Sequence, residues 1–394
     1  MTNRQPWRIG VLFSQSGPTS GSGTALLNGT NLAVSKINAA GGVHGRTIEV
    51  TSPDPGGVED NYRLLARQLN VDNNISIFFG GHTSISRKAL IPTIEGSDSL
   101  LFYPTFYEGF EYSDHVFYFG SCPNQYTVHL VDYMSQRFGS SFYLVGANYV
   151  FPRESNRIIK ELLKQSSGEL IGERYLELDS SAADAQAVVL DIEKRRPDVI
   201  FSTLVGNQIN DFYTFYNGTD LRKSGVPIAS IVTSEVEIDR MGADVAAGHY
   251  CVASYFSSLD SPESIEFVHD YKSFFGQAAR PSSLAESAFN QVMVFAKALQ
   301  LAGTIEIDAL RQAVLSTSIE APQGPIKMNA ENHHAHLWSR IGLINPNGNL
   351  VPVSTSKTSI APDPYLINHK FESWTNDAET TLNTPVMANR NHLG

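Results

Sequence analysis

The chain has 394 residues, of which 42% are apolar and 18% are charged, and its formal net charge is −11. This length predicts about two domains, each large enough to bury a core of its own. The sequence contains no run of about 18 apolar residues, which excludes a membrane-spanning helix. It also contains no cluster of Lys or Arg along which a phosphate backbone would bind, which excludes direct nucleic-acid binding.

The first residues bear on cellular location. Residues 1–7 lead directly into an apolar stretch, without the basic segment, apolar core and cleavage site of a secretory signal. We therefore predict a cytoplasmic protein, or a periplasmic one if a native leader has been removed. Cys122 and Cys251 are the two cysteines of the sequence, too few for a disulfide framework and not spaced for a metal site, so we predict buried free thiols.

The first part of the chain alternates strand-like and helix-like segments, as in βαβ units that build a parallel sheet. Strands are predicted at Arg8 to Phe13, Thr47 to Thr51, Ile75 to Phe79, Leu100 to Phe102 and Val116 to Phe119. Helices are predicted at Thr24 to Ala39, Asn61 to Leu69 and Ser86 to Ile94. The first strand is continuously apolar, which is typical of a strand buried on both faces.

A second alternating series follows, and then long helical patterns. Its strands are predicted at Phe142 to Val145, Leu170 to Leu176, Asp198 to Thr203, Ile228 to Thr233 and Tyr250 to Tyr255, and its helices at Asn124 to Phe138, Glu154 to Ser166, Ala182 to Lys194 and near Gln208 to Tyr216. Later helices at Pro262 to Phe275, Ser282 to Ala302 and Asp308 to Ser316 lack intervening strands, so we expect them to pack on the first sheet. Short strands are predicted at Ile326 to Met328, Leu337 to Ile344 and Leu350 to Ser354.

These elements predict an α/β fold with two doubly wound, Rossmann-like lobes. Lobe one is expected to comprise residues 1–120 and 256–324, lobe two residues 121–255 and 325–375, and residues 376–394 a mobile tail. The chain is expected to cross between the lobes near Gly120, Ser254 to Ser257 and Gly324. Three crossings form a hinge, so a ligand bound in the cleft would close it by a rigid-body rotation.

Polar and aromatic side chains follow three predicted strands at their carboxyl ends. In chain order they are His82, Thr83 and Ser84; Tyr103, Thr105 and Phe106; and Tyr149 and Phe151. Ligands of open parallel sheets bind at this edge, so these residues predict a small-molecule pocket. The Ser84 hydroxyl lies beside the N–H groups that begin a helix, a good site for a carbonyl or carboxylate oxygen, although helix capping alone would also explain it.

Three other motifs are interpreted as structural. Ser20 to Thr24 lies between a strand and a helix, but it lacks the third glycine of a dinucleotide loop and the lysine of a P-loop. His333, His334 and His336 fit no standard zinc spacing, so we predict a solvated hairpin and no metal. The sequence has no Gly-x-Ser-x-Gly motif and no Glu/Lys/Cys arrangement around Cys122, so we predict a binding protein without cofactor rather than an amide-hydrolysing enzyme.

Several stretches together carry a family resemblance. They are Asp54 to Gly57, Ser86 to Ala89, Tyr103 to Thr105, Tyr107 to Tyr112, Pro123 to Gln125, Pro152 to Asn156, Thr233 to Glu235, Tyr255 to Ser258 and Ala321 to Pro325. With them, the chain from Ile9 to about Tyr365 resembles type I periplasmic binding proteins, and more narrowly the cytosolic amide sensors that negatively regulate aliphatic amidase operons. Urea and short-amide receptors of ABC transporters share several of these motifs, so sensor and receptor remain alternatives.

The resemblance implies roles for individual residues. It implies that Ser84 and Thr105 hold the ligand from lobe one, that Tyr103 walls the pocket, and that Tyr149 closes over it from lobe two. The three remaining implied positions are Val205, Gly206 and Glu235, which match cleft positions that face the ligand's ammonium group in amino-acid-binding relatives.

Three positions depart from the amide-sensor pattern. His82, Phe106 and Phe151 stand where that pattern has Tyr, Pro and Tyr. Loss of phenol hydroxyls and gain of a ring change both the hydrogen bonding and the shape of the pocket. We therefore expect a small uncharged amide or urea-like ligand, with an aromatic or larger acyl part resting on Phe106.

The same resemblance implies a regulatory mechanism. A sensor of this kind sequesters an RNA-binding antiterminator protein and releases it when an inducing amide binds. The alternative is the solute-binding receptor of a urea or short-chain amide ABC transporter. The sequence leaves open whether the chain forms a homo-oligomer.

Overall fold

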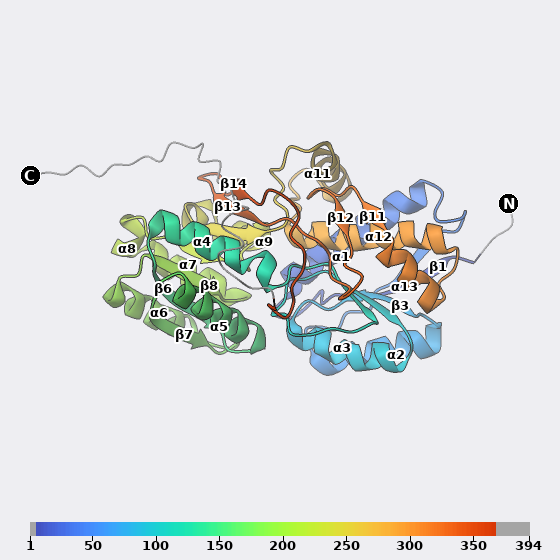
Figure 1. Ribbon diagram of the computed structural model, residues 1–394, viewed down its shortest axis with the longest axis horizontal. Coiled ribbons are helices and arrows are strands. Elements are labelled where there is room, and N and C mark those ends of the chain that lie inside the picture. Colours follow the sequence, from blue (N-terminus) through green and yellow to red (C-terminus); the bar gives the residue numbers. More distant parts are fainter. Residues whose placement is uncertain (1–4, 368–394) are drawn as a thin grey trace, which may run out of the picture.

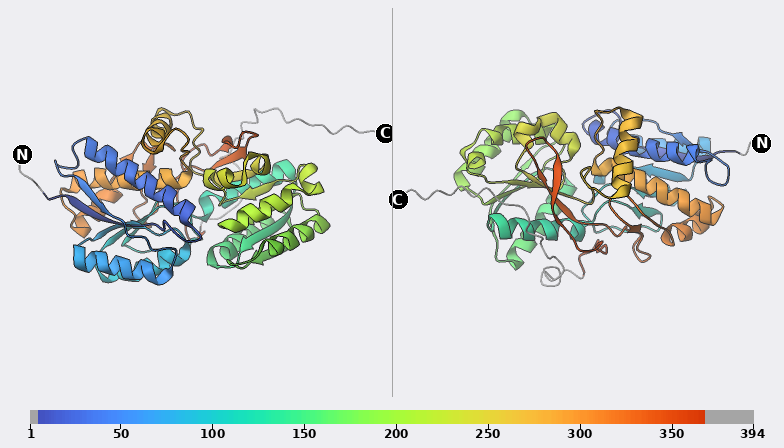
Figure 2. Two further views of the ribbon diagram at one scale, coloured as in Figure 1. Left: turned by 180° about the vertical axis from the view of Figure 1, so that it is seen from behind. Right: turned by 90° about the horizontal axis from the view of Figure 1, so that it is seen from above.

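The computed structural model describes residues 5–367 and shows two lobes side by side (Figure 1). Views from behind and from above show the same two bodies, each a sheet between layers of helices (Figure 2). The predicted fold class is confirmed. The predicted tail at 376–394 lies outside the described residues, and the exact domain boundaries stay a prediction. Within residues 5–367, no helix combines the length and the apolar character needed to cross a bilayer.

The first lobe is built on a parallel sheet with strand order β2-β1-β3-β4-β5. Its strands are β1 (Trp7–Leu12), β2 (Ile48–Thr51), β3 (Ile77–Gly80), β4 (Leu100–Tyr103) and β5 (Val116–Tyr118). Its helices are α1 (Ser20–Ala39), α2 (Glu59–Asn73), α3 (Ser84–Gly96), α11 (Pro262–Phe275), α12 (Ser283–Ala302) and α13 (Ile307–Leu315).

Both faces of this sheet are buried, as its continuously apolar strands require. Ile77 and Phe79 of β3 point into the core shared with α1, α11, α12 and α13, whereas Phe78 points into the core shared with α2 and α3. Phe295 of α12 packs edge-on against Phe79, with the ring centroids 5.5 Å apart. The late helices therefore return to the first sheet, as predicted.

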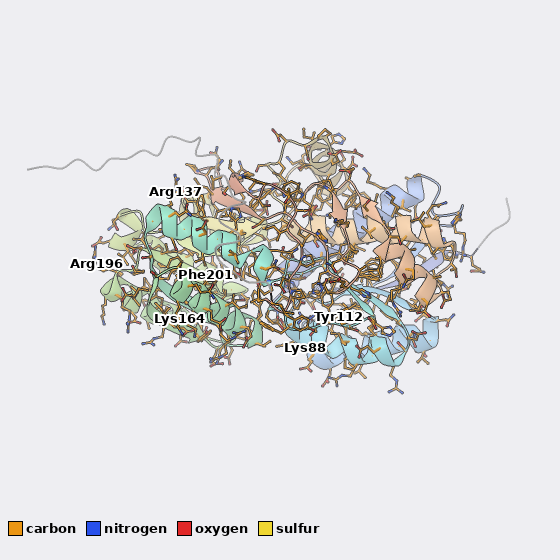
Figure 3. The ribbon with its side chains drawn as sticks, in the orientation of Figure 1. Lys88, Tyr112, Arg137, Lys164, Arg196 and Phe201 are labelled. Carbon is orange, nitrogen blue, oxygen red and sulfur yellow. The ribbon has the colours of Figure 1, made fainter. Side chains whose placement is uncertain are left out.

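The second lobe is built on a sheet with strand order β14-β13-β10-β9-β8-β6-β7, in which only β13 runs antiparallel to the other strands. Its strands are β6 (Ser141–Ala147), β7 (Glu169–Leu176), β8 (Val199–Thr203), β9 (Ile228–Ser230), β10 (Tyr250–Ala253), β13 (Arg340–Ile344) and β14 (Leu350–Thr355). Its helices are η1 (Pro123–Gln125), α4 (Thr127–Phe138), α5 (Val150–Gln165), α6 (Ala182–Arg195), α7 (Asn207–Asn217), α8 (Asp220–Lys223), α9 (Glu235–Met241) and α10 (Ala243–Ala246). Phe201 is buried inside this lobe, while Lys164 and Arg196 lie on its outside (Figure 3).

Some predicted boundaries were wrong for identifiable reasons. The predicted strand Ile228 to Thr233 ends at Ser230, because the Ser230 hydroxyl accepts hydrogen bonds from the backbone N–H groups of Val232 and Thr233. The predicted helix from Asn124 to Phe138 is broken at Tyr126, whose φ of −132° leaves helical geometry. The helix predicted from Glu154 begins earlier, at Val150.

The segment after α13 divides its contacts between the lobes. It begins with a small antiparallel pair, β11 (Ser318–Ile319) and β12 (Ile326–Lys327). Ile326, Met328 and Leu337 pack in the core of the first lobe, whereas β13 and β14 extend the sheet of the second. The sequence predicts residues 325–375 in lobe two, whereas the buried apolar side chains before β13 pack with the first lobe.

The histidine segment is buried rather than solvated, which corrects the sequence-based expectation. The His333 ring stacks on Phe117, and the His334 ring stacks on Tyr118 with the centroids 4.1 Å apart. These imidazoles are therefore packing groups. The two thiols are buried, as predicted: Cys122 follows β5 and Cys251 lies in β10.

Candidate functional site

A cavity of about 690 Å³ lies between the lobes and is lined by both. In the first sheet the strand order reverses between β1 and β3, and in the second between β6 and β8. The loops after these strands therefore diverge and leave a crevice in each lobe, as expected at the switch point of a doubly wound sheet. The two crevices face each other, and the cavity is formed where they meet.

Most of the predicted site residues meet at this cavity. Those that line it are His82, Thr83, Ser84, Thr105, Phe106, Tyr149, Phe151, Val205 and Gly206. Two predicted site residues, Tyr103 and Glu235, are not among its lining residues. The fully buried Tyr103 lies behind the wall, and its hydroxyl donates to the His82 carbonyl at 3.1 Å.

The start of α3 forms the polar floor of the first-lobe side. Thr83 caps this helix through its hydroxyl, which accepts from the Ser86 N–H, and the Ser86 hydroxyl accepts from the Thr83 N–H in return. This capping box uses Thr83 rather than Ser84. The N–H groups of Ser84 and Ile85 are the first of the helix and have no intrahelical acceptor, so they are available to an oxygen atom in the cavity.

Two side-chain atoms on this wall lack a protein partner. Among the described residues, nothing bonds to Thr105 Oγ1 or to His82 Nδ1, although both atoms are buried. Burial also lowers the pKa of His82 to about 4, so its imidazole is neutral at pH 7. An unpartnered buried polar atom is costly, and a ligand in the cavity would satisfy it.

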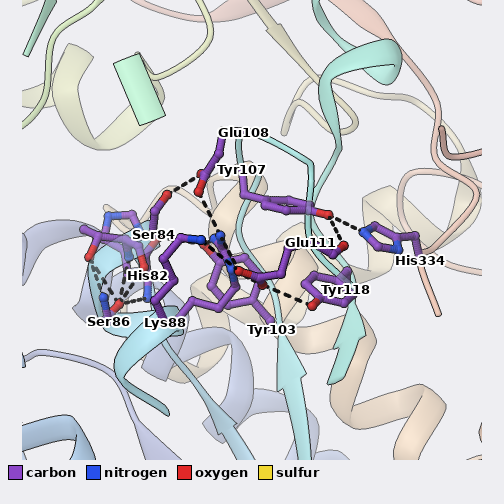
Figure 4. A network of polar contacts seen from close by, with 12 residues as sticks. His82, Ser84, Ser86, Lys88, Tyr103, Tyr107, Glu108, Glu111, Tyr118 and His334 are labelled. Atoms are coloured by element: carbon purple, nitrogen blue, oxygen red, sulfur yellow. Dashed lines mark hydrogen bonds and ion pairs between the residues drawn. The ribbon is translucent and has the colours of Figure 1, made fainter. Parts of the chain in front are cut away.

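The Ser84 side chain leads into a buried ionic network (Figure 4). Its hydroxyl donates to Glu108 Oε2, and Glu108 Oε1 accepts from Arg87 Nη2 at 2.9 Å. Arg87 Nε donates to Glu111 Oε1 at 2.7 Å, and Glu111 also pairs with Lys88 at 3.3 Å. Burial lowers the pKa of Arg87, but its interactions with Tyr103, Glu108 and Glu111 outweigh this and keep the pKa well above its usual value. The carboxylates and cations of this network balance in number.

Sequence reasoning missed Glu108 and Arg87 as parts of the site. They lie 21 residues apart, and no pattern within one element pairs them. A signal was nevertheless present, since Arg87 lies in the first turn of a helix that follows one strand end and Glu108 follows the next strand end. Gln208 was also missed: it lines the cavity in the first turn of α7, and its Oε1 has no partner among the described residues.

The second-lobe wall combines aromatic and apolar side chains with polar ones, among them Gln208 and Glu237. The Phe151 ring contacts Phe106 of the first lobe, with the centroids 5.5 Å apart, and Tyr149 lies 6.3 Å from Phe151. Burial raises the pKa of Tyr149. Gly206 has φ of 59°, and a Cβ there would approach the Pro18 carbonyl oxygen of the first lobe to 3.3 Å. The two walls therefore touch at the Phe106–Phe151 contact and approach closely at Gly206.

Glu235 lies behind the cavity wall, contrary to the position expected for it. It is the first residue of α9, and its Oε1 accepts from the Ser257 hydroxyl at 3.3 Å. Burial raises its pKa to about 7. Glu237 lines the cavity instead, and one of its carboxylate oxygens is held by the Ser234 hydroxyl and N–H.

The charged lining residues differ in exposure. Glu59, Asp179 and Arg240 are exposed, Asp211 is partly buried and Glu237 is buried. Within residues 5–367, no group of three or more His, Cys, Asp or Glu side chains is arranged to hold a metal ion.

Comparisons with known proteins return small-molecule-binding proteins. The chain is 23% identical over 354 residues to a Leu/Ile/Val-binding protein homolog of Brucella abortus, covering 84% of this chain and 82% of that one. It superposes with a TM-score of 0.82 and 20% identity on an ABC-transporter solute-binding protein of Rhodopseudomonas palustris in complex with 3,4-dihydroxybenzoic acid, covering 90% and 98% of the two chains. LivJ of Streptococcus pneumoniae in complex with isoleucine gives a TM-score of 0.76 at 20% identity, covering 88% and 99%.

A shorter match concerns a protein of different name. A stretch of 133 residues is 30% identical to a Geobacillus stearothermophilus protein named limonene hydroxylase, and it covers 34% of this chain and 24% of that protein. The full-length likeness is the informative one. The family described as periplasmic binding protein domain matches residues 7–370, so the chain belongs to the periplasmic binding proteins, and its solved neighbours share the type I fold.

Proposed function

We propose that this chain is a receptor that binds a small uncharged solute of the amide or urea type between its lobes, as the solute-binding component of an ABC transporter. The observation that carries the proposal is the pair of buried, unpartnered polar atoms, Thr105 Oγ1 and His82 Nδ1, in a cavity that is also lined by aromatic rings.

The polar groups suit an amide. The free N–H groups at the start of α3 would donate to a carbonyl oxygen, and the Thr105 hydroxyl would supply a second hydrogen bond. Phe106, Tyr149 and Phe151 would cover the flat amide group and any ring or alkyl chain attached to it. This arrangement binds a planar, neutral molecule with both a donor and an acceptor.

The charges do not favour a carboxylate solute. Lining side chains include four carboxylates, Glu59, Asp179, Asp211 and Glu237, against the single cation of Arg240. The named ligands of the similar structures, 3,4-dihydroxybenzoic acid and isoleucine, are acids. We therefore propose that this chain shares their mode of cleft binding and differs from them in the charge of its solute.

The transport receptor is preferred to the sensor because the comparisons return binding proteins of ABC transporters. The cytosolic amide sensor that releases an antiterminator is the second candidate, favoured by the stretches from Tyr107 to Tyr112 and from Pro152 to Asn156. The two predict different behaviour with a candidate antiterminator. A sensor would release it when amide is added, whereas a transport receptor would not associate with it.

A thermal-unfolding titration with acetamide, butyramide, benzamide, urea and leucine tests the proposal. A ligand that binds the folded state raises the melting temperature by mass action. For a solute of about four heavy atoms, the ceiling of about 1.5 kcal/mol per atom predicts a Kd of about 40 μM or weaker. A rise with amides or urea supports the proposal, and a rise with leucine alone contradicts it. An assay for released ammonia separates binding from hydrolysis.

A further inference from the structure

We infer that Glu108 selects the chemical class of the ligand: it fixes the Ser84 hydroxyl as a hydrogen-bond acceptor, so the cavity takes solutes that present an N–H and rejects the matching carboxylates. The inference rests on the proposed function, because it concerns the same cavity. It adds a role for Glu108, which lies outside the cavity wall: Glu108 determines whether the hydroxyl of Ser84, which lies in the wall, donates or accepts a hydrogen bond.

The first step is the direction of one hydrogen bond. A serine hydroxyl has a single hydrogen and two lone pairs. Ser84 donates that hydrogen to Glu108 Oε2. Ser84 is a lining residue of the cavity, and its hydroxyl oxygen keeps its lone pairs, so toward a ligand this hydroxyl can only accept.

The second step is that Glu108 is held as an acceptor. Its side chain is 4% exposed, and its other oxygen accepts from Arg87 at 2.9 Å. The guanidinium of Arg87 is fully buried and has no lone pair with which to accept. Arg87 in turn is fixed by Glu111 and stacks near the ring of Tyr107, 4.5 Å from the centroid. Rotation of Glu108 away from Ser84 would therefore disrupt several buried contacts.

The third step concerns the ligand. An amide or urea carries an N–H that Ser84 can accept and a carbonyl oxygen for the N–H groups of α3. A carboxylate of the same shape has no N–H, and its negative charge would lie one hydroxyl away from the Glu108 carboxylate. Like charges in a poorly solvated site repel strongly.

A purely structural role makes a different prediction. If Glu108 only balances the charge of Arg87, then Glu111 does the same, since it pairs with the same guanidinium at 2.7 Å. The Ser84 hydroxyl donates to Glu108 and not to Glu111. Glu111→Gln is therefore a matched control: it removes one carboxylate from Arg87 and leaves the Ser84 hydroxyl as it is.

The experiment measures calorimetric affinities of the full chain for two isosteric pairs, benzamide with benzoate and butyramide with butyrate. Wild type is expected to bind the better amide at least about tenfold more tightly than its acid, the effect of one charge-assisted hydrogen bond. Glu108→Gln is expected to lower that ratio about tenfold or more, because a carboxamide can donate to Ser84 and frees its hydrogen for the acid. Glu111→Gln is expected to leave the ratio within about threefold.

The possible outcomes are distinct. If wild type binds neither amides nor acids, the proposed function fails and this inference falls with it. If amides bind but wild type does not discriminate against the acids, or Glu108→Gln and Glu111→Gln change the ratio equally, only the inference is overturned. Should Glu108→Gln not fold, Ser84→Ala decides: loss of amide affinity without gain of acid affinity supports an acceptor role, and unchanged amide affinity refutes it.

Discussion

The two walls of the cavity differ in how they are held. The first-lobe wall places its hydroxyls in front of a buried network in which Arg87 is shared by Glu108 and Glu111. The second-lobe wall includes Tyr149 and Phe151, whose rings pack against other apolar side chains. Directional contacts need such fixed partners, whereas ring contacts tolerate small displacements. We therefore expect the first lobe to choose the functional group of the ligand and the second to choose its size.

The largest expected effect tests the network itself. Arg87→Leu leaves Glu108 buried without its cation, so the free energy of unfolding is expected to fall by about 3–5 kcal/mol. Denaturant unfolding measures this change. Lys88→Ala is the control, because its exposed ammonium pairs with Glu111 at 3.3 Å and its loss is expected to cost less than about 1 kcal/mol. Equal losses in the two variants would show that the network does not stabilise the wall.

A second buried carboxyl differs from Glu108 in its hydrogen-bond partners. Glu286 of α12 has amide groups as partners, whereas Glu108 has the guanidinium of Arg87. Glu286 accepts from the backbone and side-chain nitrogens of Gln323 at 3.2 Å, and burial raises its pKa from 4.5 to about 7. The protonated form is therefore favoured by folding. Its contribution to stability is complete below about pH 4.5 and is lost as the pH rises through about 7.

The free energy of unfolding is therefore expected to fall between pH 5 and pH 8 in the wild type. In Glu286→Gln this fall is expected to be smaller by about 2 kcal/mol at pH 8. Thermal unfolding at several pH values measures the slope. The exposed Glu263→Gln serves as the control, and a variant slope equal to that of wild type would argue against a neutral buried Glu286.

The second-lobe wall is tested at Phe151. Phe151→Leu removes a ring that faces Phe106 at 5.5 Å and lines the cavity. Benzamide affinity is expected to fall by about 1.5 kcal/mol, roughly tenfold, while urea affinity changes less than about threefold. Calorimetry with both ligands gives the ratio. The exposed Phe110→Leu should change neither affinity, and equal losses for benzamide and urea would mean that Phe151 does not select by size.

The smallest effect concerns one hydroxyl. Thr105→Val keeps the shape of the side chain and removes an oxygen that has no partner in the described part of the chain. Amide affinity is expected to fall by about 1 kcal/mol with no loss of stability. Thr30→Val is a matched control, since Thr30 Oγ1 is likewise buried and unpartnered but lies outside the cavity. If both variants bind amides like wild type, Thr105 does not contact the ligand.

The fold followed from local patterns, since apolar strands that alternate with amphipathic helices leave few other architectures. The expectation that ligands bind at the carboxyl ends of parallel strands also led to Ser84 and Thr105 as cavity residues, without tertiary information. What it could not supply were contacts between distant segments, such as the ion pair between Arg87 and Glu108. The burial of His334 was missed for the same reason: its stacking on Tyr118 depends on a segment more than 200 residues away in the chain. The position of Glu235 depended on which way one side chain turns at a helix start.

The two cysteines have a practical consequence. Cys122 and Cys251 are the whole cysteine complement of the sequence, both are buried, and burial raises the pKa of both thiols. Thiolate is the reactive form, so neither should react readily with maleimide dyes while the protein is folded. One cysteine introduced on the exposed face of each lobe would therefore accept fluorophores without removal of native residues. The separation of the lobes would then be read as energy transfer while solute is added.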